Sequence, residues 1–249
     1  MPLGPYRLLA HRGDSLRAPE NTLEAVRHCR AEQADAIEVD VRLTADLEPV
    51  LFHDEDARRL TGAPGRVREL RWSRLRALRV HGKHAIPHFE DALRELESWP
   101  GAELYVDLHE PRLDLAEAVA SRLAKSSVLA RSYVLAFYWD RGVLEHARRV
   151  CPDVRLAVMP GPPWNIEASW KLGAKALCMG WDGPRNRLLY RAASKLFDVR
   201  ARLAPVLCEG VRVSAGVANT AEDLRWLVEQ GFTEFWTDDL GLARRTLTG

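Results

Sequence analysis

The chain has 249 residues, of which 47% are hydrophobic, and this is enough to build one large core. The formal net charge is +1, and no basic tail or stripe is present, so the composition gives no support for nucleic-acid binding. No window approaches the ~18 apolar residues of a membrane span, and no signal-peptide pattern opens the chain. Four widely spaced cysteines without a C-x-x-C pair are typical of reduced thiols. We therefore expect a cytoplasmic protein, and the oligomeric state is left open.

Short apolar runs predict nine β-strands, and helical patterns separate most of them. The predicted strands are Arg7–His11, Ala36–Leu43, Pro49–His53, Glu103–Leu108, Tyr133–Phe137, Arg155–Met159, Ala174–Met179, Val211–Val217 and Phe232–Thr237. The predicted helices are Leu23–Ala31, Trp72–Leu78, Phe89–Glu97, Leu115–Ala124, Gly142–Arg149, Ile166–Leu172, Leu188–Leu203, Ala221–Gln230 and Leu240–Leu247. This alternation favours a parallel sheet covered by helices.

One connection breaks the alternation. Only Thr44–Glu48 separates two predicted strands, whereas a parallel crossover needs a dozen or more residues, so these strands must form an antiparallel hairpin. Eight strands remain, and eight parallel strands with crossovers predict a TIM (β/α)8 barrel, which typically takes about 250 residues. The hairpin also returns His53 toward Asp40.

Residues 54–86 form the longest departure from the strand–helix repeat. They hold the turn-rich run T-G-A-P-G-R-V, followed by a basic amphipathic stretch. We interpret the segment as a small insertion over the barrel mouth that is too short for an independent core. The expected organisation is thus a single domain spanning residues 1–249.

The first candidate site residues follow the first strand. In a barrel of this type, catalytic groups lie at the C-terminal ends of the strands. His11 ends the first strand, Arg12 can donate two hydrogen bonds to phosphate oxygens, and Gly13 permits close backbone approach. The tripeptide is short and common, however, and by itself it favours a helix-capping loop with an incidental histidine.

Carboxylates on two other strands indicate a metal site. Glu38 and Asp40 are two residues apart and point to one face, where they would repel each other unless a cation neutralised them. Asp107 would be a third carboxylate, and this oxygen-rich set favours one divalent cation, Mg²⁺ or Ca²⁺. His109 could be a ligand, a phosphate donor or a partner of a ligand, and as a ligand it would favour Zn²⁺ or Mn²⁺. The alternatives are a polar strand exposed at a sheet edge and, for the second pair, ordinary hydrogen-bonded core residues.

Aromatic residues follow several later strands, and in a barrel they would surround one mouth. They are Phe137, Tyr138, Trp139, Trp164, Trp181 and Trp236. We predict that Phe137, Trp181 and Trp236 line an apolar wall beside the charged centre, where they would contact substrate. Packing is the alternative role.

The combined motifs resemble the glycerophosphodiester phosphodiesterases. The matching stretches are H-R-G…P-E-N-T, E-V-D-V-R-L-T-A-D-L-E-P-V-L-F-H-D, R-L-T-G and I-P-H-F-E-D-A-L, and their order and spacing hold from His11 to Leu93. The later F-W-T-D-D resembles the last strand of the family. The resemblance implies a barrel that uses a divalent cation to hydrolyse glycerophosphodiesters to sn-glycerol 3-phosphate and an alcohol.

The resemblance also implies roles for single residues. His11 and His53 would be the acid–base pair, Glu38 and Asp40 would bind the metal, and Arg12 would contact the phosphate. The attacking oxygen, from water or from a substrate hydroxyl, is left open.

Three departures from the family pattern concern the substrate more than the reaction. Asp107-x-His109 replaces the usual Glu-x-Lys, although the similar spider-venom phospholipases D also have Asp there. Ala136 replaces a serine, and Gly216 replaces a tryptophan of the pocket. At neutral pH we expect His109 to supply only part of the lysine's charge.

These departures leave alternatives open. One is a lysophospholipase D-like activity on lysophospholipids, which the aromatic mouth favours. Another is a homologue that binds phosphodiesters but has weakened catalysis. An amidohydrolase barrel is disfavoured because the first strand lacks H-x-H.

Overall fold

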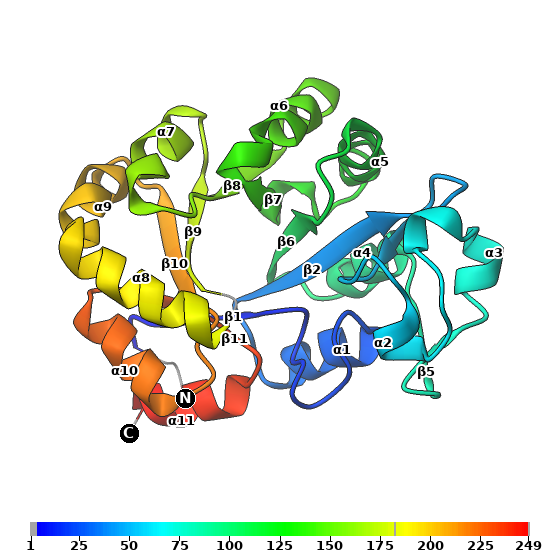
Figure 1. Ribbon diagram of the computed structural model, residues 1–249, viewed down its shortest axis with the longest axis horizontal. Coiled ribbons are helices and arrows are strands. Elements are labelled where there is room, and N and C mark those ends of the chain that lie inside the picture. The colour runs from blue at the N-terminus through cyan, green and yellow to red at the C-terminus, as the bar shows by residue number, and fades with distance from the viewer. Residues whose placement is uncertain (1–3, 182, 249) are drawn as a thin grey trace.

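The computed structural model describes residues 4–181 and 183–248, and it shows a closed barrel surrounded by helices (Figure 1). The strands are β1 (Arg7–Ala10), β2 (Ala36–Leu43), β3 (Pro49–Leu51), β4 (Arg79–Val80), β5 (His84–Ala85), β6 (Glu103–Leu108), β7 (Ser132–Phe137), β8 (Arg155–Met159), β9 (Ala176–Gly180), β10 (Arg212–Gly216) and β11 (Glu234–Thr237). The α-helices are α1 (Leu23–Ala31), α2 (Arg58–Thr61), α3 (Trp72–Leu75), α4 (Phe89–Glu97), α5 (Leu113–Leu123), α6 (Arg141–Val150), α7 (Ile166–Lys171), α8 (Pro184–Leu196), α9 (Val199–Cys208), α10 (Ala221–Glu229) and α11 (Leu240–Thr248).

Eight of the described strands close the barrel, which confirms the predicted fold class. The pairing order is β1-β11-β10-β9-β8-β7-β6-β2, and β1 also pairs with β2 in parallel. The ninth strand of this sheet, β3, runs antiparallel to β2 through Val41↔Leu51, so the predicted hairpin is also confirmed. Because β1 pairs with the start of β2 and β3 with its end, the hairpin occupies the edge of β2 nearest the C-terminal mouth.

Apolar side chains pack on both faces of the barrel wall. The larger cluster lies between the strands and the helices and includes Ile37, Val39 and Val41 of β2. The smaller cluster includes Tyr105, Tyr133 and Trp236, with the two tyrosine rings stacked 4.4 Å apart. Residues of the two clusters alternate along the strands, because one face of the barrel wall contacts the helices and the other fills the interior.

The insertion has a small apolar cluster that it shares with the hairpin. Leu60, Val67 and Leu75 pack there with Val50 and Phe52, so the cluster depends on residues around β3. Figure 1 places α2 and α3 at the rim of the barrel beside the end of β2 rather than across the opening. The predicted helix beginning at Trp72 ends after one turn, and the β4–β5 hairpin follows it.

The single helix expected over Leu188–Leu203 is wrong, because the chain forms two helices there. Helix α8 ends at Leu196, and Asp198 adopts a left-handed conformation (φ 43°) that turns the chain. The side chain of Asp198 then accepts a hydrogen bond from the backbone of Ala201 and starts α9. Aspartate is well suited to both tasks, since it tolerates this conformation and caps helices.

Candidate active site

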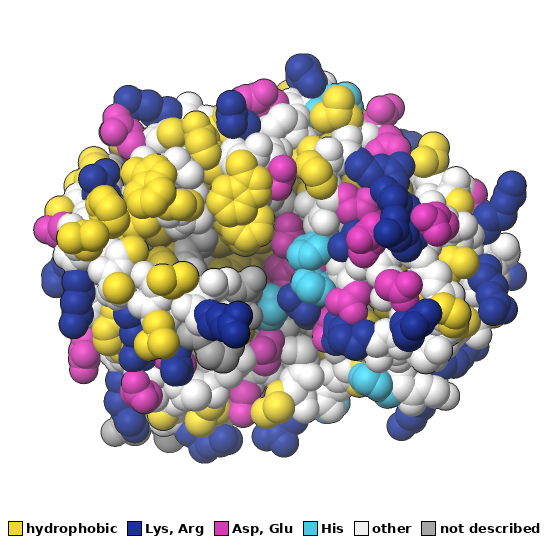
Figure 2. All heavy atoms as spheres, viewed as in Figure 1, with side chains coloured by type: hydrophobic (Ala, Val, Ile, Leu, Met, Phe, Trp, Pro, Cys, Tyr) yellow, Lys and Arg dark blue, Asp and Glu magenta, His cyan; other side chains and the backbone are white. Residues whose placement is uncertain are grey.

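The candidate site lies at the C-terminal ends of β1, β2 and β6, beside the residues that follow β3. Figure 2 shows a hollow there in which histidine and acidic side chains gather. Apolar side chains cover one side of the hollow, and charged side chains cover the other. The mouth of the barrel is therefore polar at its centre and asymmetric at its rim.

Three carboxylates form the acidic centre. Asp40 of β2 is the register partner of Asp107 of β6, and Glu38 lies one strand repeat below Asp40 on the same face. One oxygen from each of the three lies within 4.8 Å of the others. Glu38 and Asp40 are almost fully buried, so this group concentrates negative charge in a poorly solvated place.

The three carboxyl groups differ in acidity. Burial, with the neighbouring carboxylates adding to it, raises the pKa of Glu38 well above its usual value and also raises the pKa of Asp107. Burial would do the same to Asp40, but a hydrogen bond from His109 and the charge of Arg12 outweigh it and hold the pKa of Asp40 well below its usual value. In the absence of a cation, Glu38 and Asp107 are therefore weaker acids than Asp40.

Arg12 is built into this centre. Its backbone adopts φ 60° and its amide donates to Glu38 at 2.8 Å, while its guanidinium lies 3.2 Å from Asp40 and donates to Glu20 at 3.1 Å. Asn21 also braces Asp40, donating to the carboxylate at 2.7 Å and accepting from the Asp40 amide at 3.0 Å. The predicted phosphate contact thus lies at the acidic centre, where its guanidinium donates one hydrogen bond, to Glu20, and pairs with Asp40.

His11 is held in place from the far end of the chain. Its Nδ1 lies 2.8 Å from Oδ1 of Asp238, which follows β11, and Ser15 donates to the same oxygen. Asn219 donates to the other carboxylate oxygen. Within residues 4–181 and 183–248, the Nε2 atom of His11 has no hydrogen-bond partner, so this nitrogen is available for a substrate.

His53 is held in the same way by its neighbour. Its Nδ1 lies 2.7 Å from Oδ1 of Asp54, and Asp54 in turn accepts hydrogen bonds from Arg59 of α2. The same guanidinium binds both carboxylate oxygens of Glu20 at 2.8 and 2.7 Å. Burial lowers the pKa of His53, which favours its neutral form near pH 7.

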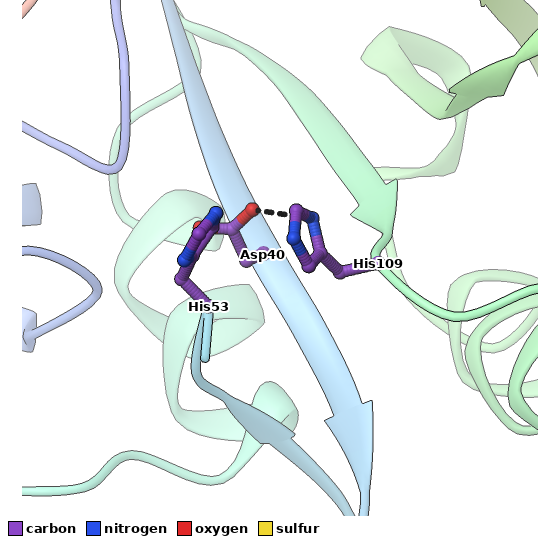
Figure 3. Close-up of side chains that lie close together, drawn as sticks. All are labelled: Asp40, His53 and His109. Carbon is purple, nitrogen blue, oxygen red and sulfur yellow. Dashed lines mark ion pairs between the residues drawn. The ribbon is translucent and has the colours of Figure 1, made fainter. Parts of the chain in front are cut away.

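His109 lies between the two carboxylates that flank it. Its Nδ1 is 3.2 Å from Asp40 and 3.4 Å from Asp107, and its ring packs against that of His53 with centroids 4.2 Å apart (Figure 3). Burial would lower the pKa of His109, but the two carboxylates outweigh this effect and raise it to about 10. In the cation-free site His109 is therefore a cation, and the expectation that it supplies only part of a lysine's charge does not describe this geometry.

The donor set fits a divalent cation. One oxygen of Glu38, Oε1, is buried without a hydrogen-bond partner, which is costly unless a ligand meets it. Glu38, Asp40 and Asp107 offer three oxygens in mutual reach, as Mg²⁺ or Ca²⁺ prefers. A second group of mutual neighbours, Asp40 with His53 and His109, shares only Asp40 with the first.

The three aromatic residues predicted to contact substrate occupy different places. Phe137 is partly exposed at the mouth and stacks on Trp139, with ring centroids 4.3 Å apart. Trp181 is buried against Tyr190 of α8. Trp236 is buried in the barrel interior, where its Nε1 donates to Ser214. The two buried tryptophans pack the wall of the barrel, and of the three only Phe137 has a partly open surface.

The residues that hold the catalytic candidates in place were not identified from the sequence. They are Glu20, Asn21, Asp54, Arg59 and Asp238. All five lie inside the motifs P-E-N-T, H-D, R-L-T-G and T-D-D, so the signal was present, but nothing in a single sequence pairs a motif residue with its partner.

A parallel barrel with acid and histidine side chains at its C-terminal mouth has the architecture of a TIM-barrel enzyme. The chain belongs to the glycerophosphoryl diester phosphodiesterase family, whose model matches residues 11–242. A glycerophosphodiester phosphodiesterase of Caldanaerobacter subterraneus subsp. tengcongensis is 41% identical over 253 residues, covering 93% of each chain. The bovine glycerophosphodiester phosphodiesterase 1 is 41% identical over 78 residues, and this match spans only 24% of its length.

Solved structures share the fold. A candidate glycerophosphoryl diester phosphodiesterase of Silicibacter pomeroyi superposes with a TM-score of 0.81 at 23% identity, covering 97% of this chain and 92% of that one. A phosphodiesterase of Oleispira antarctica, solved with the product sn-glycerol-3-phosphate, has a TM-score of 0.75 at 21% identity and covers 98% of this chain and 97% of its own.

Proposed function

We propose that the chain hydrolyses glycerophosphodiesters to sn-glycerol 3-phosphate and an alcohol, with one divalent cation. The observation that carries the proposal is the pairing of each mouth histidine with a carboxylate through Nδ1, beside three clustered carboxylates. Family membership and the product-bound relative from Oleispira antarctica support the substrate class.

The proposed mechanism divides the work between the two histidines. Asp238 accepts a hydrogen bond from Nδ1 of His11 and orients the ring, so that Nε2 can donate the proton that the leaving alkoxide needs. His53, whose pKa is lowered by burial, takes the proton of the attacking water or hydroxyl. The cation, held by Glu38, Asp40 and Asp107, would neutralise charge on the phosphoryl oxygens.

Arg12 and His109 place positive charge around the same centre. The Arg12 guanidinium is held by Asp40 and Glu20, and it keeps donors that these residues do not use. Arg12 approaches Oδ2 of Asp40, and His109 approaches the other oxygen, Oδ1. Both are suited to binding the phosphodiester anion and holding it between His11 and His53.

The test measures hydrolysis of glycerophosphocholine with Mg²⁺, with Ca²⁺ and after chelation. Replacing His11 or His53 by Ala should lower kcat by about 10²–10⁴-fold, the usual worth of a positioned proton-transfer group. His28→Ala, at an exposed position of α1, is the matched control and should keep full activity. Wild-type rates in either site variant, or activity that chelation does not change, would contradict the proposal.

The stacked pair Phe137 and Trp139 at the mouth favours a second candidate, lysophospholipase D-like activity. The acyl chain, which stays on the phosphorylated glycerol while the headgroup alcohol leaves, would contact this apolar surface. Comparing kcat/KM for lysophosphatidylcholine and glycerophosphocholine separates the two. A preference for the lysophospholipid that Trp139→Ala abolishes would favour this second candidate.

A further inference from the structure

A large apolar surface lies beside the mouth, and none of it takes part in the proposed hydrolysis of glycerophosphodiesters. We call it the apolar face, and it consists of Trp139, Trp164, Leu188, Leu189 and Leu196. These side chains are 55–79% exposed, and Figure 2 shows apolar side chains spread over the surface next to the hollow. Contiguous exposed apolar surface of this kind usually marks an interaction site.

Contacts between neighbouring loops join these residues into one surface. Trp139 follows β7, and its ring lies over Gly161 in the next loop. The contact is so close that a Cβ added to Gly161 would lie 2.5 Å from the Trp139 ring. Trp164 belongs to that same loop and contacts Phe197 at the end of α8, with ring centroids 5.4 Å apart. The loops after β7 and β8 and the outer side of α8 therefore form one continuous face on the mouth side of the barrel.

The charged residues of α8 are all basic. The helix carries Arg185, Arg187, Arg191 and Lys195 and has no acidic residue. Arg187 and Arg191 are paired with Asp223 at the start of α10, at 3.1 and 2.7 Å, and so fasten the helix to the barrel. Arg185 and Lys195 are exposed, and neither forms an ion pair with any residue that the structure describes.

We infer that the apolar face docks the barrel mouth onto the surface of a membrane rich in anionic lipid. Two exposed tryptophans suit the headgroup region, because their rings are apolar with one polar edge. Exposed leucines would enter the acyl boundary, as in interfacial amphipathic helices. The exposed cations of α8, Arg185 and Lys195, would meet anionic headgroups.

A second copy of the chain fits this face less well. A twofold dimer through α8 would set Arg185 and Lys195 of one copy against the same cations of the other, and no acid of α8 would compensate them. An anionic surface removes this conflict. The inference goes beyond the proposed function, because docking needs no turnover.

The test is co-sedimentation with vesicles of phosphatidylcholine alone and of equal parts phosphatidylcholine and phosphatidylglycerol. The wild-type chain should bind the anionic vesicles, and the variant Leu188→Ser/Leu189→Ser should bind them at least about tenfold more weakly, because two leucines no longer enter the lipid. Leu207→Ser is the matched control, since Leu207 is 53% exposed at the end of α9, just before β10 begins and hence at the opposite end of the barrel. The control should bind like the wild type.

A second pair of changes tests the role of charge. Arg185→Gln/Lys195→Gln should lose about tenfold in affinity for anionic vesicles and leave the weak binding to phosphatidylcholine unchanged. No binding to either vesicle, or equal loss in the Leu207 control, would overturn the inference. So would a dimer that Leu188→Ser/Leu189→Ser dissociates. Turnover of soluble glycerophosphocholine is measured separately. The vesicle-binding result can therefore be interpreted even if the proposed function fails.

Discussion

The Nδ1 atom of His109 lies 3.2 Å from Oδ1 of Asp40, at the position where the family pattern has a lysine. In the cation-free site the carboxylates around it outweigh burial and raise its pKa to about 10, so there it carries the positive charge that a lysine would carry. We expect His109→Lys to keep kcat/KM for glycerophosphocholine within a few fold. The neutral variant His109→Gln should lower it by about 10²-fold, as for other lost charge-stabilising donors.

This pair of substitutions distinguishes charge from shape. If His109→Gln retained activity while His109→Lys lost it, the packing of the imidazole on His53 would matter and its charge would not. Thermal unfolding of both variants checks that the barrel remains intact.

Cation binding should release protons. In the cation-free site, burial raises the pKa of Glu38 and of Asp107, so these groups bind protons more readily than ordinary carboxyls, and a metal ligand must be deprotonated. The affinity for Mg²⁺ should therefore rise as the pH rises. Calorimetry in two buffers of different ionisation enthalpy measures the protons released, and Glu38→Gln should reduce their number. An affinity that does not change with pH would contradict this assignment of the ligands.

Asp54 should set the acid limit of the pH–rate profile. Burial lowers the pKa of His53, whereas the hydrogen bond to Asp54 raises it, so removing that bond lowers the pKa of His53 further. In Asp54→Asn the acid limb of kcat/KM should move to lower pH, while kcat falls because the ring is no longer held. Glu55→Gln changes a neighbouring, exposed carboxylate and should leave both quantities unchanged. An acid limb that moved to higher pH would show that another group controls it.

The same carboxyl group should contribute to acid stability. Burial opposes the ionised form, but hydrogen bonds from Arg59 and His53 outweigh it and lower the pKa of Asp54 to about 2. Because the pKa is lower in the folded state, this stabilisation is present above the unfolded value near 3.8 and is lost as the pH falls toward 2. Denaturant unfolding of Asp54→Asn should therefore show a weaker loss of stability than the wild type over this pH range.

The sequence predicted the frame of the site well and its supporting bonds poorly. Strand β2 was predicted with its exact bounds because it alternates apolar and acidic residues, and the short link to Pro49 required the hairpin. Those two features bring Asp40 and His53 together. The bond between His11 and Asp238 joins residues 227 positions apart, and no local pattern encodes such a contact.

Two other features depended on the tertiary structure. The break between α8 and α9 rests on one left-handed residue, Asp198, in a run whose apolar periodicity continues across it. Trp181 and Trp236 have the spacing of mouth residues, but one turns outward onto α8 and the other into the barrel. Position at a strand end predicts nearness to the mouth, whereas the direction of a side chain is decided by packing.

Arg42 should couple the stability of the barrel to the position of His53. Its Nε donates to the backbone oxygen of His53 at 2.6 Å, and its guanidinium donates to Glu110 at 2.6 Å, one residue past His109. Arg42 is buried, and losing one partner of such a pair leaves the other charge uncompensated. We expect Arg42→Met to lower the free energy of unfolding in urea by about 3 kcal/mol.

The double variant Arg42→Met/Glu110→Gln should recover part of that loss, because no buried charge remains. Its kcat should stay low, because the backbone of His53 has lost its hydrogen bond from Arg42. Equal stability of the single and double variants would mean that an unpaired Glu110 costs no stability, and a normal kcat would mean that β3 alone holds His53.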